Sequence, residues 1–353
     1  MYVSSFIYHP ATVADWCDVG QVTIDILPDI ALLDIFDCHV NQAREEEGRN
    51  FLKIQAWHTL VHVCRKWRTI VLESPRRLDL RLLCTEKTPV KEMLAVWPPL
   101  PIVIGQHIQP TQLGNIIEAL EHNDRVCQID LFDMTNWQLE KVLGAMQRPF
   151  SALTRLVIEL EYWPKGGVPP RADEIPPAIP EMFLGGSAPR LQHLELVHVP
   201  FPGLPKLLLS ATDLVSLSVS KTPHSGYISP EVMARCLSTL TRLESLSLGF
   251  ESPLSRPVQE TQRPHPPTRS ALPALFVFQF EGVTEYLEDL VARIDAPLLH
   301  SFDITFFFDQ PIFDTQQLAQ FVARTPSIQR PVEAHFVIFY SHVEITSLTL
   351  YFP

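Results

Sequence analysis

The sequence predicts an α/β protein in which a small helical module precedes a solenoid of parallel strands and intervening helices. Two observations favour the solenoid. Strand-like cores of the form L-x-x-L-x-L recur along most of the chain, and a helical stripe lies between successive cores. A third observation favours the module, because the apolar residues between positions 26 and 67 follow helical spacing rather than strict alternation.

The helical module is expected to begin with a helix at Pro28 and Asp29. Proline suits the first turn because its fixed φ is helical and its missing N–H would have no partner there. The aspartate places a carboxylate at the positive end of the helix dipole. The apolar stripe behind them comprises Ile30, Leu32, Leu33, Ile35 and Phe36. This is more apolar surface than so short a helix can bury against itself.

A second helix is expected over residues 57–67, with Arg65, Lys66 and Arg68 on its wet side. Its stripe comprises Trp57, Leu60, Val61, Cys64 and Trp67. Residues 41–50, between the two helices, are charged and poor in apolar side chains, which is typical of a solvated loop or a helix extension. One interpretation of the pair is a helical hairpin that simply packs on the rest of the protein.

The strand-like cores recur at intervals typical of leucine-rich repeats. Their middle apolar residues are separated by 27 residues (Ile129 to Leu156), 23 (Leu194 to Leu217), 29 (Leu217 to Leu246) and 24 (Phe278 to Phe302). A residue suited to cap a helix precedes each of several helical stripes: Thr111, Asn136, Ser229, Thr284 and Asp314. Because strands and helices alternate, the sheet is expected to be parallel.

Two intervals are longer: 38 residues with seven prolines (Leu156 to Leu194) and 32 residues with six prolines (Leu246 to Phe278). Proline at this density cannot continue a helix or a central strand, so we expect insertions near 163–187 and 252–273 outside the solenoid core. After residue 333 the period ends, since only 340–342 separate two apolar runs. No crossover helix fits there, which predicts an antiparallel hairpin over 333–353 that caps the solenoid.

The start of the helical module resembles an F-box. The resemblance rests on the Leu-Pro-Asp start at Leu27, the Ile35–Phe36 pair and the run from Val63 to Trp67 that leads into residues 74–80. The chain as a whole is similar to the F-box proteins with leucine-rich repeats found in mushroom-forming fungi. The resemblance covers residues 24 to about 104 strongly, and the remainder only through the repeats.

In that family the F-box docks on a Skp-family adaptor of a cullin ubiquitin ligase, and the repeats hold a protein substrate. The resemblance therefore implies a substrate receptor of an SCF ligase, in the cytoplasm or nucleus. The residues it assigns to the adaptor face, or to its support, are Leu27, Pro28, Ile30, Leu33, Ile35, Cys64 and Trp67. The alternative is a repeat-based interaction scaffold that never meets the ligase.

The solenoid offers a second candidate surface. In a parallel repeat sheet the leucines point into the core, and the residues between them face the concave side. The candidate substrate-binding residues there are Glu159, His193, Glu195, Ser218, Ser247, Gln279, Glu281 and Asp303. An ordinary solvated sheet face would carry the same kind of residues.

Composition excludes several other functions. A net charge of −12 is not that of a general nucleic-acid binder, and six scattered cysteines without a Cys-x-x-Cys pair suit buried thiols in a reducing compartment. No secretory signal or apolar run of membrane-spanning length is found in the sequence. Glycine-rich phosphate loops and nucleophile motifs are absent too. His58 and His62 are four residues apart, as some zinc-binding pairs are, but no glutamate lies between them, so we predict no metal site. Because these motifs are absent, we also predict no cofactor and no enzymatic activity.

These inferences divide the chain into four parts: a leader over 1–22, the F-box over 23–73, the repeat solenoid over 74–332 and the hairpin cap over 333–353.

Overall fold

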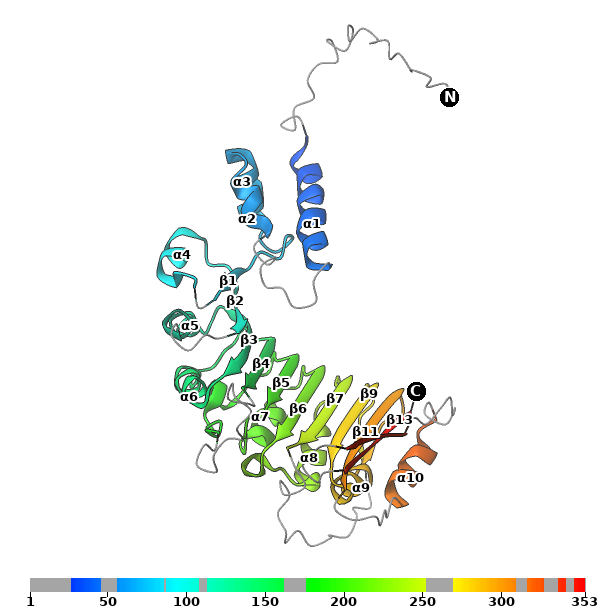
Figure 1. Cartoon of the computed structure of the whole chain (residues 1–353). Helices are drawn as coiled ribbons and strands as arrows, with labels where there is room; N and C mark the ends of the chain where they lie inside the picture. The colour runs from blue at the N-terminus through cyan, green and yellow to red at the C-terminus, as the bar shows by residue number, and fades with distance from the viewer. Residues whose placement is uncertain are drawn as a thin grey trace, which may run out of the picture. The chain divides into compact units, whose positions relative to one another are not determined.

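The computed structural model describes residues 27–45, 56–85, 87–107, 113–161, 176–251, 269–308, 316–326, 336–340 and 346–352. The expected leader lies outside these residues. The chain divides into two compact units, residues 1–80 and 81–353, which are described separately here (Figure 1).

The first unit contains helices α1 (Asp29–Glu45), α2 (Ala56–Val61) and α3 (Arg65–Glu73). The Pro28 carbonyl accepts hydrogen bonds from the backbone N–H groups of Ala31 (3.0 Å) and Leu32 (3.1 Å), so this proline immediately precedes α1 and is not part of its first turn. Since α1 continues to Glu45, the first half of the 41–50 segment is a helix extension.

The expected continuous second helix is wrong, because α2 and α3 are separate. Cys64 stands before α3 in an extended conformation (φ −156°), and its Sγ accepts the backbone N–H of Trp67 at 3.5 Å. This side chain takes the place of a helical hydrogen bond and starts a new helix. The break lets Trp67 pack against Phe36 of α1, with their ring centroids 4.7 Å apart.

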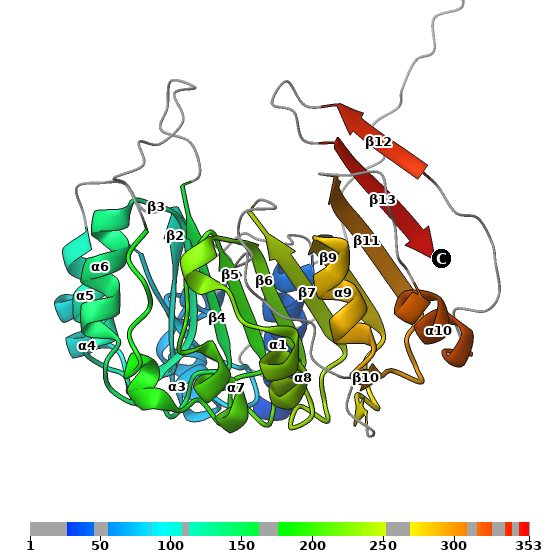
Figure 2. The ribbon, with the colours of Figure 1, turned by 90° about the horizontal axis from the view of Figure 1, so that it is seen from below.

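The second unit is built of alternating strands and helices (Figure 1, Figure 2). The strands are β1 (Leu82–Cys84), β2 (Ile102–His107), β3 (Val126–Met134), β4 (Arg155–Leu160), β5 (His193–Val197), β6 (Ser216–Thr222), β7 (Ser245–Phe250), β8 (Ser270–Ala271), β9 (Val277–Gly282), β10 (Ile294–Asp295), β11 (Ser301–Phe308), β12 (Phe336–Tyr340) and β13 (Thr346–Phe352). The helices are α4 (Val90–Val96), α5 (Leu113–Leu120), α6 (Asn136–Ala145), α7 (Leu204–Ser210), α8 (Pro230–Leu237), α9 (Thr284–Val291) and α10 (Gln316–Arg324), with short 3-10 helices η3 (Phe183–Gly186) and η4 (His224–Gly226).

Eleven strands form one sheet in the order β1-β2-β3-β4-β5-β6-β7-β9-β11-β13-β12. From β1 to β11 all neighbours are parallel and follow the chain order, so the expected α/β class with a mostly parallel sheet is confirmed. Helices α5 to α9 lie along one face of this sheet (Figure 1, Figure 2).

The recurring apolar residues set the register of the sheet. Six of them pair in a single row across six strands, and each is at most 1% exposed: Leu156, Leu194, Leu217, Leu246, Phe278 and Phe302. Burial alternates along the strands, as in β5 and β9, so one face packs on the helices and the other carries the polar residues. We call this second face, from β4 to β11, the polar face.

The helix caps follow the expectation only in part. Ser229 caps α8 by accepting the N–H of Val232 at 3.4 Å, as expected. The cap of α6 is Thr135 and not Asn136, because its hydroxyl and the Gln138 side chain form a reciprocal capping box. Thr284 is the first residue of α9, whose cap position, Val283, makes no side-chain hydrogen bond. The expected caps at 111 and 314 lie outside the described residues.

The two expected insertions are packed in part. Residues 162–175 and 252–268 lie outside the described residues, but Ile179, Phe183 and Leu184 are each at most 1% exposed within the core. Placing all of 163–187 outside the core was therefore wrong, because apolar side chains among the prolines pack there. The end of the second insertion contributes β8, which pairs with β10.

The expected antiparallel hairpin is present as β12 and β13. Strand β13 also pairs antiparallel with β11, bringing Ile304 opposite Leu350 and Phe306 opposite Leu348. The hairpin thus continues the sheet beyond β11 instead of lying across its end.

Candidate interaction surfaces

The first candidate surface is the outward face of α1. Leu32, Phe36 and Val40 are at most 2% exposed, and their spacing of four residues aligns them on one side of the helix. Ile30 and Ile35 point elsewhere and remain 65% and 47% exposed. Two isoleucines on one helix are thus left in contact with solvent.

The predicted adaptor-binding residues divide into two groups. Pro28 is exposed like Ile30 and Ile35, whereas Leu27, Leu33, Cys64 and Trp67 are half-buried. Within the second group, Cys64 caps α3, and the Trp67 ring packs on Phe36. These two residues support the surface more than they form it.

The chain ahead of α1 is tied to α3. The Lys66 ammonium donates to the Leu27 carbonyl at 3.1 Å and lies 3.5 Å from the Asp29 carboxylate. Arg77 contacts the Asp34 carboxylate, between Ile30 and Ile35 on α1. Val63, which is 57% exposed just before α3, was not among the predicted site residues. Its exposure follows from the break between α2 and α3, which the sequence pattern did not show.

The second candidate surface is the polar face. One register row crosses it from β5 to β11 and contains five of the predicted substrate-binding residues: Glu195, Ser218, Ser247, Gln279 and Asp303. His193 lies in the row before it, and Glu159 and Glu281 lie in the row after it. The structure therefore brings all eight predicted residues onto one face.

At the β3–β4 end of this face, a carboxylate is buried. Asp130 is 2% exposed, and its carboxylate accepts the Nε–H of Arg155 at 2.9 Å and an amide N–H of Gln128. Burial is the main cause that lowers the pKa of His193, and the positive charge of Arg155 lowers it further. The Asp130 carboxylate opposes this shift. His193 is therefore held toward its neutral form. Sequence reasoning identified this face but not the Asp130–Arg155 pair.

The β7–β11 end of the second unit is acidic. Burial raises the pKa of Glu251 and Asp303. The Glu281 side chain is exposed overall, yet neighbouring protein atoms desolvate its carboxylate and raise its pKa, while Lys221 opposes the shift. Asp303 also has a buried Oδ1 without a hydrogen-bond partner among the described side chains. In the described part of the chain, the Asp303 carboxylate is thus incompletely hydrogen-bonded.

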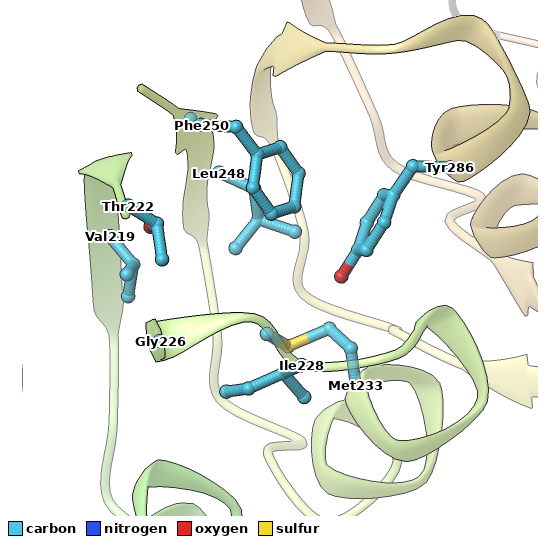
Figure 3. Close-up of a pocket in the computed structure, with 9 residues that line it drawn as sticks. Val219, Thr222, Gly226, Ile228, Met233, Leu248, Phe250 and Tyr286 are labelled. Atoms are coloured by element: carbon cyan, nitrogen blue, oxygen red, sulfur yellow. The ribbon is translucent and has the colours of Figure 1, made fainter. Parts of the chain in front are cut away.

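A pocket lies at the carboxyl ends of β6 and β7 (Figure 3). Its walls come from β6, η4, α8, β7 and α9, and its lining is Val219, Thr222, Gly226, Ile228, Met233, Leu248, Gly249, Phe250 and Tyr286. The space of about 260 Å³ that these residues border includes open solvent, so the enclosed part is much smaller. No sequence motif pointed to it, because five separate elements contribute.

Within the described ranges, no group of three or more His, Cys, Asp or Glu side chains is arranged to hold a metal ion. Burial is the main cause that lowers the pKa of His58, with His62 contributing. Cys84 and Cys236 are buried free thiols, as expected, and burial raises the pKa of Cys84 to about 12. Cys38 is instead exposed. Among the described helices, none is both long and apolar enough to cross a membrane.

Comparison with known proteins adds no relative: no protein-family model matches the chain, and no curated protein matches it.

Proposed function

We propose that this chain is the substrate-receptor subunit of a cullin-type SCF ubiquitin ligase. Its F-box would bind a Skp-family adaptor, and its leucine-rich-repeat solenoid would bind a protein substrate. The observation that supports this most is the exposure of Ile30 and Ile35 on α1, beside Pro28. These are positions that the F-box resemblance assigns to the adaptor interface.

Energetics favour a partner at this surface. Fully burying an isoleucine side chain is favourable by about 1.5–3 kcal/mol, so two exposed isoleucines offer several kcal/mol to an interface. The unit beneath them is held by the Phe36–Trp67 contact and by the Lys66 hydrogen bond to Leu27. A preformed surface of this kind loses little conformational entropy on binding.

The polar face supports the second half of the proposal. It presents rows of polar side chains across parallel strands, with the apolar core on the opposite side. A repeat sheet can carry a different partner on such a face without disturbing its core. In this function the chain performs no chemistry itself and brings a substrate close to the ubiquitin-transferring subunits, in the cytoplasm or nucleus.

The test is calorimetric titration of the purified Skp-family adaptor of the source organism into the full chain. Replacing Ile30 and Ile35 together by alanine should weaken binding by about 2 kcal/mol or more, roughly 30-fold. The matched control replaces Leu209 and Leu298, which are 49% and 58% exposed in the second unit, and should bind like the wild type. All four side chains are exposed, so folding is not expected to suffer.

Two outcomes would contradict the proposal. If the wild-type chain does not bind the adaptor, the interaction-scaffold alternative is favoured. If both double variants lose affinity equally, or neither does, the adaptor does not use this face of α1.

A further inference from the structure

The residue that precedes α1 cannot cap this helix with its side chain. Pro28 stands at that position, and its carbonyl accepts the backbone N–H groups of Ala31 and Leu32 at 3.0 and 3.1 Å. Proline has no side-chain acceptor, so it cannot bind the N–H groups of the first turn as serine or aspartate does at this position. Helix ends fray, and the first turn of α1 therefore depends on contacts from elsewhere in the unit.

A cation from α3 supplies such contacts. Helix α3 packs beside α1 in the first unit (Figure 1). The Lys66 ammonium donates to the Leu27 carbonyl at 3.1 Å and lies 3.5 Å from the Asp29 carboxylate. One side chain of α3 thus holds both the residue before Pro28 and the residue after it.

These contacts fix a local conformation more than they stabilise the whole fold. The Lys66 and Asp29 side chains are 37% and 67% exposed. An ion pair with this exposure contributes little to the free energy of unfolding, because water and salt screen it. Leu27, however, precedes a proline and is already restricted to extended conformations. Once its carbonyl is bound by Lys66, few orientations of this segment remain.

The segment held in this way belongs to the first candidate surface. Pro28 and Ile30 lie within it, and both are exposed. The proposed function places both residues in the adaptor interface. A partner that binds the ordered start of α1 has an apparent affinity proportional to the fraction of chains in which that start is ordered. Lys66 can therefore control the affinity for the adaptor without contacting it.

We propose that Lys66 is a positioning residue of the adaptor-binding surface. Its contacts with Leu27 and Asp29 hold Pro28 and Ile30 in the conformation that the adaptor binds. This role rests on the proposed function, but the ordering of α1 on which it depends can be measured with no adaptor present.

The test compares the full-length wild type with Lys66→Met, which removes the ammonium and keeps an unbranched side chain of high helix propensity. In hydrogen exchange of the free chain, the amides of Ala31 and Leu32 should exchange at least about threefold faster in the variant, because the first turn of α1 frays more often. In calorimetric titration with the purified Skp-family adaptor, Kd should rise about two- to fivefold, because fewer chains present an ordered surface. The thermal midpoint should stay unchanged. Lys66→Arg, which keeps a cation with N–H donors, should behave like the wild type in both measurements.

The matched control is Arg76→Met, which removes the same charge from an exposed residue just after α3 and should leave exchange and affinity unchanged. Equal exchange at the start of α1 in the two methionine variants would overturn the role of Lys66, whether or not the adaptor binds. Lower affinity without faster exchange would also overturn it, since Lys66 would then contact the adaptor directly. A wild-type chain that does not bind the adaptor would overturn the proposed function, and with it the adaptor-binding role of this segment. That failure is distinguishable, because the difference in exchange between the two variants would remain.

Discussion

His198 should make the stability of the second unit fall as the pH drops from 7 to 5. This residue follows β5, is 6% exposed, and has a left-handed backbone conformation with φ of 60°. Burial, with a smaller contribution from Lys221, lowers the pKa of its imidazole from 6.5 to about 4. The folded protein therefore keeps the ring neutral at a pH at which the unfolded chain protonates it.

The sign and size follow from proton linkage. Between pH 6.5 and 4 the unfolded chain binds the extra proton, so this part of the stability is present above pH 6.5 and is lost as the pH falls. With these two pKa values, the free energy of unfolding should fall by about 2 kcal/mol between pH 7 and 5. Burial raises the pKa of Glu251, Glu281 and Asp303, so these carboxylates contribute to the pH dependence with the opposite sign.

The assay is urea unfolding of the wild type and of His198→Asn at both pH values. Asparagine does not titrate here and tolerates a left-handed conformation, so the variant isolates the imidazole. The difference in unfolding free energy between the two proteins should change by about 2 kcal/mol from pH 7 to pH 5. The same difference at both pH values would refute the reasoning, since His198 would then be free to protonate in the folded state.

Three further predictions concern the β11 end of the parallel sheet. Glu288→Ala should lower the free energy of unfolding by about 1–2 kcal/mol in urea titrations, because its carboxylate accepts the first N–H groups of α10 at 2.7 and 2.8 Å; an unchanged midpoint would argue against this cap. Phe302→Ala should lower the free energy of unfolding by about 3–5 kcal/mol, because the Phe302 ring packs between those of Phe278 and Phe321. Replacing the half-exposed Phe276 by alanine should lower it far less, and equal effects of the two substitutions would contradict the assigned core. Deleting residues 333–353 should expose the edge of β11 and cause association in size-exclusion chromatography, and a monodisperse monomer would show that the hairpin does not protect that edge.

The register of the parallel sheet could be predicted from the sequence because it depends on periodicity. Leu194, Leu217 and Leu246 occupy the same position in their cores, so any parallel pairing that buries one of them buries all three. The polar face followed from the same alternation. This alternation could not predict the burial of Asp130, because that burial depends on Arg155, which lies on the next strand and 25 residues away in the sequence.

The helical module shows a different limit. The apolar residues of α1 surround much of the helix, so spacing alone does not say which of them pack inward. That choice depends on the position of Trp67, which follows from the break at Cys64. Cysteine is not among the usual capping residues, and the break therefore carried no recognisable signal. The pocket was unpredictable for a similar reason, because its walls meet only after the repeats have stacked.

The most direct measurement of the proposed function is hydrogen exchange of the full chain with and without the purified Skp-family adaptor. If the adaptor docks on the helical module, backbone amides at the start of α1 and around Val63 should become protected, and amides of β5 to β11 should exchange at unchanged rates. No change in the first unit at saturating adaptor, or protection confined to the polar face, would contradict the assignment of α1 as the adaptor-binding element.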